Sequence, residues 1–182
     1  MKQLLLDLAL PAGGLNSIIT SADAPLLQLL QALIAGQRYE PSLYLWGDVG
    51  VGKTHWLRAS ADSARAEGWQ AYYIDAATQS LDDPLYEVAN WLAIDNLHTL
   101  DDAGQFEFFA LYNQQRQQGG VILSSSAVHC QQLPVRADII TRLQWGLQFP
   151  LSPLTEADTL AALKWHAHMR GFDLPDDVAR YL

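Results

Sequence analysis

Hydrophobic positions fall in short runs that alternate with stretches of helical spacing. Five runs have the length of buried strands: 43–46, 70–74, 91–94, 121–124 and 143–149. Between two of them, the segment 101–117 has helical spacing, in Phe106, Phe109 and Tyr112 or Asn113. Because buried parallel strands need helical crossovers, this alternation predicts a parallel α/β sheet flanked by helices.

Further helices are predicted before the first strand and after the last. The first is expected over about 24–35, with Asp23 as its N-cap and Gly36 as its end. The second is expected over about 156–170, with Thr155 as its N-cap, and another begins near Asp173. Two short amphipathic helices cannot form a core alone, so this end predicts the start of a small helical subdomain.

The composition is that of a folded, acidic protein. Hydrophobic residues make up 49% of the 182 positions and charged residues 17%, so the chain can bury a sizeable core, unlike a disordered tail. Eleven Lys and Arg residues against twenty Asp and Glu residues give a formal charge of −9. That balance argues against a surface that wraps DNA or RNA by itself, because phosphates require a basic face.

Cysteine usage and the lengths of the apolar runs bear on the compartment. A single cysteine, Cys130, excludes an internal disulfide framework and a multi-cysteine zinc site, and we expect it on a solvated loop. No apolar run approaches the roughly 20 residues of a membrane span. Asp7 interrupts the leucine-rich start, which is too short for a signal peptide. The sequence therefore predicts a soluble, cytoplasmic protein with no membrane partner.

The sharpest motif follows the first expected strand and matches G-x-x-x-x-G-K-[ST] in full: Gly47, Asp48, Val49, Gly50, Val51, Gly52, Lys53 and Thr54. Glycines let successive backbone N–H groups turn toward one anion, and the next helix adds partial positive charge at its N-terminus. Lys53 is expected to reach the β- and γ-phosphates of a nucleotide, and the Thr54 hydroxyl to hold Mg²⁺. His55 completes the nucleotide-binding candidates, although packing or capping is its ordinary role.

A companion acid is expected at the end of a neighbouring apolar strand. Asp95 follows the run 91–94, and we assign it with Thr54 to the Mg²⁺ site and to the catalytic machinery. Asn96 comes next, where many hydrolases of this type carry Asp or Glu to polarise the attacking water. An amide cannot accept that proton, so intrinsic hydrolysis should be slow.

Several segments together resemble one family. They are the phosphate-binding loop, the pair Asp95-Asn96, the run 141–146 (TRLQWG) and the run 169–178 (MRGFDLPDDV). These segments are similar to the Hda family, regulatory inactivators of the bacterial replication initiator DnaA and members of the AAA+ ATPases. The resemblance covers nearly all of the chain. It implies an AAA+ P-loop NTPase core, with a five-stranded parallel sheet flanked by helices.

The resemblance also implies a division of the chain and roles for particular residues. The core would span 15–152, after a flexible segment over 1–14 and before a partial helical lid over 153–182. Arg142 corresponds to the arginine finger that AAA+ proteins offer to the γ-phosphate of a neighbour's ATP. The plain alternative is a surface arginine at a helix end, or one paired with an acid.

The end of the fourth strand occupies the place of the family's γ-phosphate sensor. Ser125 and Ser126 are the candidates there, able to donate a hydrogen bond. The family usually has Asp followed by Arg after this strand, where Ser126 and Ala127 stand here. A run of serines is also an ordinary polar strand exit, so both interpretations stay open.

The N-terminal residues Gln3, Leu4, Leu6 and Leu8 resemble the peptide, of the form Q-L-x-L-x-L, by which such replication factors dock onto the sliding clamp. The Gln3 amide would bond the rim of an apolar groove, and the three leucines would fill its pockets. The alternative is an ordinary N-terminal strand on the edge of the sheet.

Two functions from different classes are therefore carried forward. The first is a regulatory adaptor that binds ADP or ATP with Mg²⁺ and docks onto the DNA-loaded sliding clamp (the beta subunit of DNA polymerase III). It would offer Arg142 to DnaA, promote hydrolysis of DnaA-bound ATP and prevent re-initiation. The second is an autonomous AAA+ ATPase that loads or remodels replication factors. No strong direct binding of nucleic acid is expected, and self-association is a further option.

Overall fold

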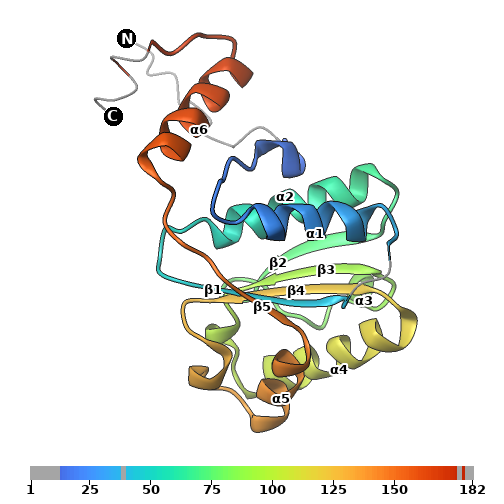
Figure 1. The fold of residues 1–182 in the computed structure, drawn as a ribbon. Helices are drawn as coiled ribbons and strands as arrows, with labels where there is room; N and C mark the ends of the chain where they lie inside the picture. The colour runs from blue at the N-terminus through green and yellow to red at the C-terminus, as the bar shows by residue number, and fades with distance from the viewer. Residues whose placement is uncertain (1–12, 38–39, 176–177, 179–182) are drawn as a thin grey trace, which may run out of the picture.

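The computed structural model describes residues 13–37, 40–175 and 178, and shows a parallel sheet between two layers of helices (Figure 1). The strands are β1 (Ser42–Trp46), β2 (Ala71–Asp75), β3 (Trp91–Asp95), β4 (Val121–Ser126) and β5 (Leu147–Pro150). The helices are α1 (Ala24–Ile34), α2 (Lys53–Ala66), α3 (Pro84–Glu87), α4 (Asp102–Gln118), α5 (Ala137–Trp145) and α6 (Glu156–Met169). The five strands lie in the order β2-β3-β4-β1-β5.

Alternating side chains in each strand supply a core on both faces of the sheet. In β1, Leu43 and Leu45 pack toward α1 and α2, whereas Tyr44 packs toward α4 and α5. In β3 the same alternation holds, and all five of its residues are buried. A strand buried on both sides needs no polar face, which explains why these segments read as continuous apolar runs.

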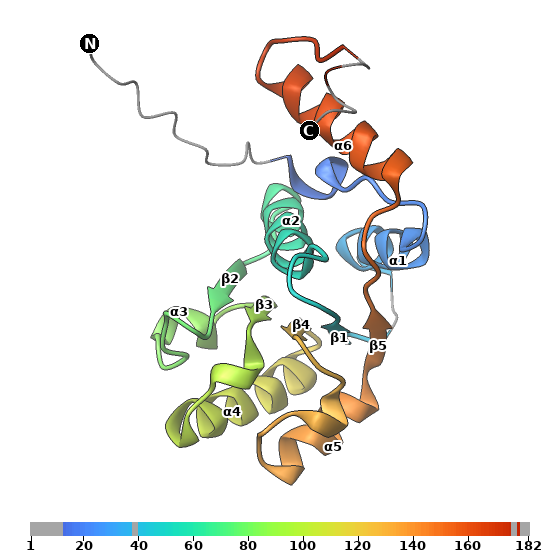
Figure 2. The same cartoon turned by 90° about the vertical axis from the view of Figure 1, so that its left-hand side faces the viewer.

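The helices form one layer on each face of the sheet, and α6 packs near the start of the described chain. Helices α1 and α2 cover one face of the sheet, and α3, α4 and α5 cover the other (Figures 1 and 2). Helix α6 follows β5 and lies beside the short 3₁₀ helix Gly14–Ser17, on the α1 and α2 side. Ser21 Oγ donates to Asp158 Oδ2 at 2.8 Å, which ties the start of α6 to the segment before α1.

One sequence-based boundary and one expected helix cap were wrong. The fifth strand begins at Leu147, not at residue 143, because Leu143 to Trp145 form the last turn of α5. Gly146 ends this helix where the chain passes close to β1, so a Cβ there would collide with the backbone oxygen of Ser42. At the start of α1, the Asp23 side chain makes no capping hydrogen bond, although the helix begins at Ala24 as expected.

Helix α4 buries some of its aromatic residues and exposes others. Phe106 is 60% exposed and Phe109 is half-buried, whereas Phe108 and Tyr112 are fully buried. The core face of α4 therefore runs through Phe108 and Tyr112. Of the aromatic residues noted at helical spacing in the sequence, Tyr112 belongs to this face, whereas Phe106 and Phe109 lie beside it.

Some predictions fall outside the residues that the structure describes. These are the clamp-peptide residues Gln3, Leu4, Leu6 and Leu8 and most of the second helix expected after Asp173. Within the described residues, none of the helices is both long and apolar enough to pass through a lipid bilayer.

Candidate functional site

The phosphate-binding loop joins the end of β1 to the start of α2, as the motif requires. β1 ends at Trp46 and α2 begins at Lys53, so the intervening loop opens at the N-terminus of a 14-residue helix. Gly52 is the N-cap residue of this helix. Its φ of 96° lies in the left-handed region, which favours glycine. The helix therefore presents the partial positive charge of its first turn to the loop.

Lys53 is held against the loop rather than extended into solvent. Its Nζ donates to the carbonyl oxygens of Gly47 and Asp48, at 2.7 Å each, and the residue is 9% exposed. Burial lowers the pKa of the ammonium, and the carboxylates of Asp95 and Asp48 partly offset that effect. A cation that has lost much of its water is well placed to bind an anion that enters the loop.

Asp95 is the centre of a buried cluster of hydrogen bonds. The residue is 1% exposed, and its Oδ2 accepts from Thr54 Oγ1 at 2.5 Å. Its Oδ1 accepts from the backbone N–H of Asn96 at 3.0 Å and from the Ser125 hydroxyl. The structure thus brings together Thr54, Asp95 and Ser125, from three different elements, beside the loop.

Sequence reasoning missed one member of this cluster, Tyr73. Its hydroxyl donates to Asp95 Oδ2 at 3.1 Å, the oxygen that also accepts from Thr54. Burial first, and then the nearby Asp95 charge, raise the Tyr73 pKa to about 12, so the phenol keeps its proton at neutral pH. Arg58 lies over the ring, with its Cζ 4.7 Å from the centroid. The only sequence signal was a tyrosine near the end of a strand.

Asn96 is fixed beside the cluster in a left-handed conformation, with a φ of 60°. Its Nδ2 donates to Asp75 Oδ1 at 2.8 Å, at the end of the neighbouring strand. The amide is therefore committed to a carboxylate and, lacking a basic atom, cannot take a proton from an attacking water. Slow intrinsic hydrolysis stays a prediction.

The two sensor candidates diverge. Ser125 reaches Asp95, whereas Ser126 lies on the next pleat and its Oγ is 3.1 Å from His98 Nδ1. Because side chains alternate along a strand, adjacent serines cannot both reach one site. The structure brings only Ser125 into the Asp95 cluster.

His55 lines a small cavity next to the phosphate-binding loop. The cavity, of about 120 Å³, is bounded by the segment 17–20, the loop glycines 50 and 52, and α6. His55 Nε2 lies 3.1 Å from Ser17 Oγ, and its ring centroid lies 6.3 Å from that of His166. His55 therefore joins three segments around a concave space next to the phosphate-binding loop.

We predict that His55 makes the protein less stable in weak acid. Burial lowers the His55 pKa below its ordinary value of 6.5, so the unfolded chain takes up this proton at a higher pH than the folded one. The free energy of unfolding should fall as the pH drops from about 6.5 toward the folded pKa. Thermal unfolding of His55→Gln should show a smaller fall over this window.

His168→Gln is the matched control, because His168 is 79% exposed and lies outside the cavity. This variant should retain the wild-type pH dependence. An identical fall in stability for wild type and His55→Gln would contradict the assignment to His55.

Arg142 lies far from the phosphate-binding loop of its own chain. Gly146, one helical turn later, packs at Ser42 where β1 begins, whereas the loop follows Trp46 where β1 ends. At a rise of about 3.3 Å per residue, β1 separates these positions by roughly 13 Å. Helix α5 also lies on the opposite face of the sheet from α2 (Figure 1). Arg142 is therefore not placed to act on its own loop.

Specific contacts hold Arg142 at the edge of α4 and α5. Its Nε donates to Asn113 Oδ1 at 3.0 Å, and its guanidinium carbon lies 3.9 Å from the centroid of Phe109. Its NH1 group donates to the Asp138 carbonyl at 3.2 Å. These partners are an amide, a ring and a carbonyl, so no carboxylate among the described residues cancels its charge. The interpretation as an arginine paired with an acid does not fit this geometry.

Cys130 was expected on a solvated loop, and that expectation was wrong. The residue is fully buried, and its thiol donates to Gln148 Oε1 at 3.3 Å. Burial raises the thiol pKa, which disfavours the thiolate that nucleophilic chemistry would need. Cys130 therefore belongs to the core beneath α5.

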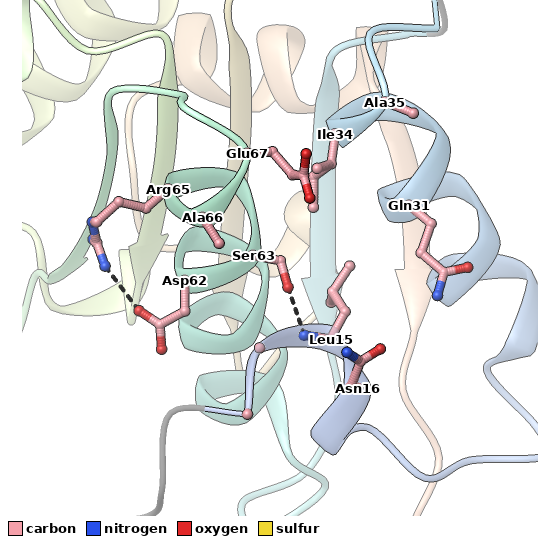
Figure 3. A pocket seen from close by; sticks show the side chains of 12 residues that line it. Leu15, Asn16, Gln31, Ile34, Ala35, Asp62, Ser63, Arg65, Ala66 and Glu67 are labelled. Atoms are coloured by element: carbon pink, nitrogen blue, oxygen red, sulfur yellow. Dashed lines mark hydrogen bonds and ion pairs between the residues drawn. The ribbon is translucent and has the colours of Figure 1, made fainter.

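A larger cavity, of about 800 Å³, lies between the 3₁₀ helix and the C-terminal ends of α1 and α2 (Figure 3). Polar groups in its wall bond to one another: the Leu15 N–H donates to Ser63 Oγ at 2.8 Å, and Arg65 pairs with Asp62 at 2.9 Å. None of the predicted site residues that the structure describes lines it. The chemistry-bearing groups are concentrated at the phosphate-binding loop instead.

Comparison with known proteins adds a family and a set of similar structures. The model of the family described as bacterial DnaA ATPase domain matches residues 22–150. Domain III of DnaA from Thermotoga maritima has a TM-score of 0.81 at 19% identity, over 94% of this chain and 80% of that one. AMPPCP-bound DnaA from Aquifex aeolicus has a TM-score of 0.75 at 22% identity, over 94% of this chain and 59% of that one.

A third similar structure is the solution structure of protein NMB1076 from Neisseria meningitidis. It has a TM-score of 0.55 at 31% identity, over 75% of this chain and 87% of that one. The two DnaA structures, at lower identity, establish the shared fold. The chain spans 59% of the length of the Aquifex aeolicus structure.

Proposed function

The chain belongs to the bacterial DnaA ATPase domain family, and on that basis we propose that it is an Hda-type regulator of replication initiation. The membership itself implies a role in initiation or its regulation. The proposed activity is finer: the chain binds an adenine nucleotide, docks onto the DNA-loaded sliding clamp and promotes hydrolysis of ATP bound to DnaA. Re-initiation would then be prevented until DnaA is recharged with ATP.

Nucleotide binding is supported by the arrangement of the loop and the Asp95 cluster. Lys53 is placed to contact the phosphates of ADP or ATP, and the first turn of α2 supplies backbone N–H groups. Thr54 Oγ1 and Asp95 Oδ2 lie together and are oxygen ligands of the kind that Mg²⁺ prefers. Mg²⁺, when bound, would offset phosphate charge. The similar DnaA structure from Aquifex aeolicus is described as bound to AMPPCP.

The position of Arg142 is the observation that carries the regulatory proposal. It lies at the opposite end and on the opposite face of the sheet from its own loop, and within the part of the chain that the structure describes no carboxylate neutralises its guanidinium. An arginine held in that way suits a γ-phosphate supplied by another subunit, where it would stabilise the charge of the transition state. We assign that other subunit to DnaA.

The second candidate function is an autonomous AAA+ ATPase. Lys53, Thr54 and Asp95 favour it, whereas the amide of Asn96, fixed on Asp75, favours the adaptor. Steady-state turnover by the chain alone distinguishes the two. We expect turnover well below about one per second, the lower end of ordinary enzyme rates. Turnover at or above that rate, abolished by Lys53→Ala, would favour the autonomous enzyme.

The clamp-docking part of the proposal rests on the N-terminal residues Gln3, Leu4, Leu6 and Leu8, which lie outside the described residues. We predict that replacing Gln3, Leu6 and Leu8 with alanine weakens binding to the purified clamp by about 100-fold or more, because an anchor peptide loses most of its buried contacts. A clamp pull-down or a titration of labelled clamp measures the loss.

The matched control is Lys2→Ala, which changes a neighbouring position outside the motif. This variant should bind the clamp almost as the wild type does. Equal binding of the wild type and the triple variant would remove the docking part and leave the proposal about Arg142 standing.

A further inference from the structure

An unusual surface runs along the outer edge of α4 and α5. Arginines and aromatic rings alternate there, and we call this set the arginine–aromatic surface: Phe106, Phe109 and Arg116 from α4, with Arg136, Arg142 and Trp145 from α5 and the residue that precedes it. The α4 members recur at helical spacing and so share one side of that helix. The two helices lie together below the sheet in Figures 1 and 2.

Consecutive cation–ring contacts connect its members. The Cζ of Arg136 lies 4.0 Å from the centroid of Phe106 and 5.8 Å from that of Phe109. Arg142 continues the series, 3.9 Å from Phe109 and 5.5 Å from Trp145. Arg116 closes it, 5.7 Å from Trp145. Stacking of this kind holds long side chains in place before any partner arrives, which lowers the entropy lost on binding.

The surface also exposes two large aromatic side chains to solvent. Phe106, at one end of the series, is 60% exposed, and Trp145, next to Arg116 at the other end, is 56% exposed. Arg142 lies between them. Binding hot spots in protein interfaces are enriched in aromatic residues and arginine, the residue types that are exposed together here. The core of α4 is completed by other residues, such as Phe108 and Tyr112.

The charge of this surface favours an acidic protein partner. Arg136 pairs with Asp138 at 2.7 Å and Arg116 with Glu40 at 3.2 Å, whereas Arg142 contacts no carboxylate of the residues in the described ranges. The surface is thus weakly positive on a chain whose formal charge is −9. Binding of nucleic acid would need more positive charge, because each contacted phosphate is best neutralised by a Lys or Arg residue.

We propose that the arginine–aromatic surface docks the ATPase whose nucleotide Arg142 reaches, with Phe106 and Trp145 as its apolar anchors. This inference rests on the proposed function, since it takes DnaA as that ATPase. Continuity supports it: Arg142 lies within the series, so a partner that surrounds its guanidinium also covers the neighbouring rings. Arg136, stacked on Phe106, extends the contact toward that end of the surface.

Phe106→Ala tests the docking role separately from the chemistry of Arg142. The measurement is single-turnover hydrolysis of DnaA-bound ATP at rising concentrations of the complete chain, with clamp-loaded DNA present. We expect the half-saturating concentration to rise about tenfold or more, as for loss of a hot-spot side chain, while the rate at saturation stays at the wild-type value. Leu85→Ala is the control, because Leu85 is 53% exposed on α3 and lies outside the surface.

Unchanged half-saturation for both Phe106→Ala and the double variant Phe106→Ala, Arg136→Ala would overturn the proposal. If the wild type does not accelerate hydrolysis, the proposed function fails, and titration of labelled chain with ATP-bound DnaA still tests the docking. Binding that Phe106→Ala weakens and Leu85→Ala does not would support it. Absence of binding would overturn it, as would Phe106-dependent binding of a single-stranded oligonucleotide in place of the protein.

Discussion

Arg142→Ala should abolish the ability of this chain to accelerate hydrolysis of ATP bound to DnaA, reducing the stimulated rate by about 10³-fold or more. The guanidinium would contact the γ-phosphate of that ATP, where negative charge develops in the transition state. Alanine cannot stabilise this charge. The contacts of Arg142 with Asn113 and Phe109 keep the side chain in place, so wild type needs little reorganisation. Single-turnover hydrolysis with pre-bound labelled ATP measures the rate.

Arg142→Lys is the informative companion variant. Lysine keeps the charge but lacks the planar fork of donors, so it should restore little of the lost rate. Arg142 is partly exposed, and both variants should unfold within a few degrees of wild type. Full stimulation by Arg142→Ala, with the protein folded, would contradict the assignment of this residue to the partner's ATP.

Lys53→Ala should weaken binding of ATP or ADP to the chain by about 100-fold. The ammonium donates to the loop carbonyls of Gly47 and Asp48 and is placed to donate to phosphate oxygens instead. Loss of charge-assisted hydrogen bonds of this kind costs about 3 kcal/mol, and each 1.4 kcal/mol is about tenfold in affinity. Isothermal titration or fluorescence of a labelled nucleotide gives the two dissociation constants.

Arg65→Ala provides the matched control for Lys53. Both residues lie on α2, but Arg65 lies in its last turn and forms an exposed ion pair with Asp62. Its loss should leave nucleotide affinity within about twofold of wild type, since surface ion pairs contribute little. Equal affinity of wild type and Lys53→Ala would mean that the nucleotide, if bound at all, does not use the loop.

The sequence predicted the fold well for segments whose burial leaves a clear pattern of apolar residues. Strands buried on both faces, such as β1 and β3, appear as short apolar runs, and the predicted five-stranded AAA+ core is confirmed. The approach of Thr54 to Asp95 was also predictable, because the carboxyl ends of parallel strands meet at one edge of a sheet. Local pattern and general topology were enough for both.

The features that the sequence missed depend on neighbours that only the fold supplies. Tyr73 reaches Asp95 because β2 lies next to β3, an order that the periodicity does not contain. Residues 143–145 were assigned to the fifth strand because a short apolar run fits a strand or a buried helix equally well. The helical spacing of Phe106 and Phe109 did not show which aromatic residues of α4 are buried: Phe108 fills the core and Phe106 lies outside.

The central claim is that this chain supplies an arginine to ATP held by DnaA, and one measurement tests it most directly. Hydrolysis of ATP pre-bound to DnaA of the same organism is followed with the wild-type chain and clamp-loaded DNA each present or omitted. The account predicts that the rate rises only when both are present. Hydrolysis that is equally slow in all four mixtures, with the chain folded and bound to the clamp, would contradict it.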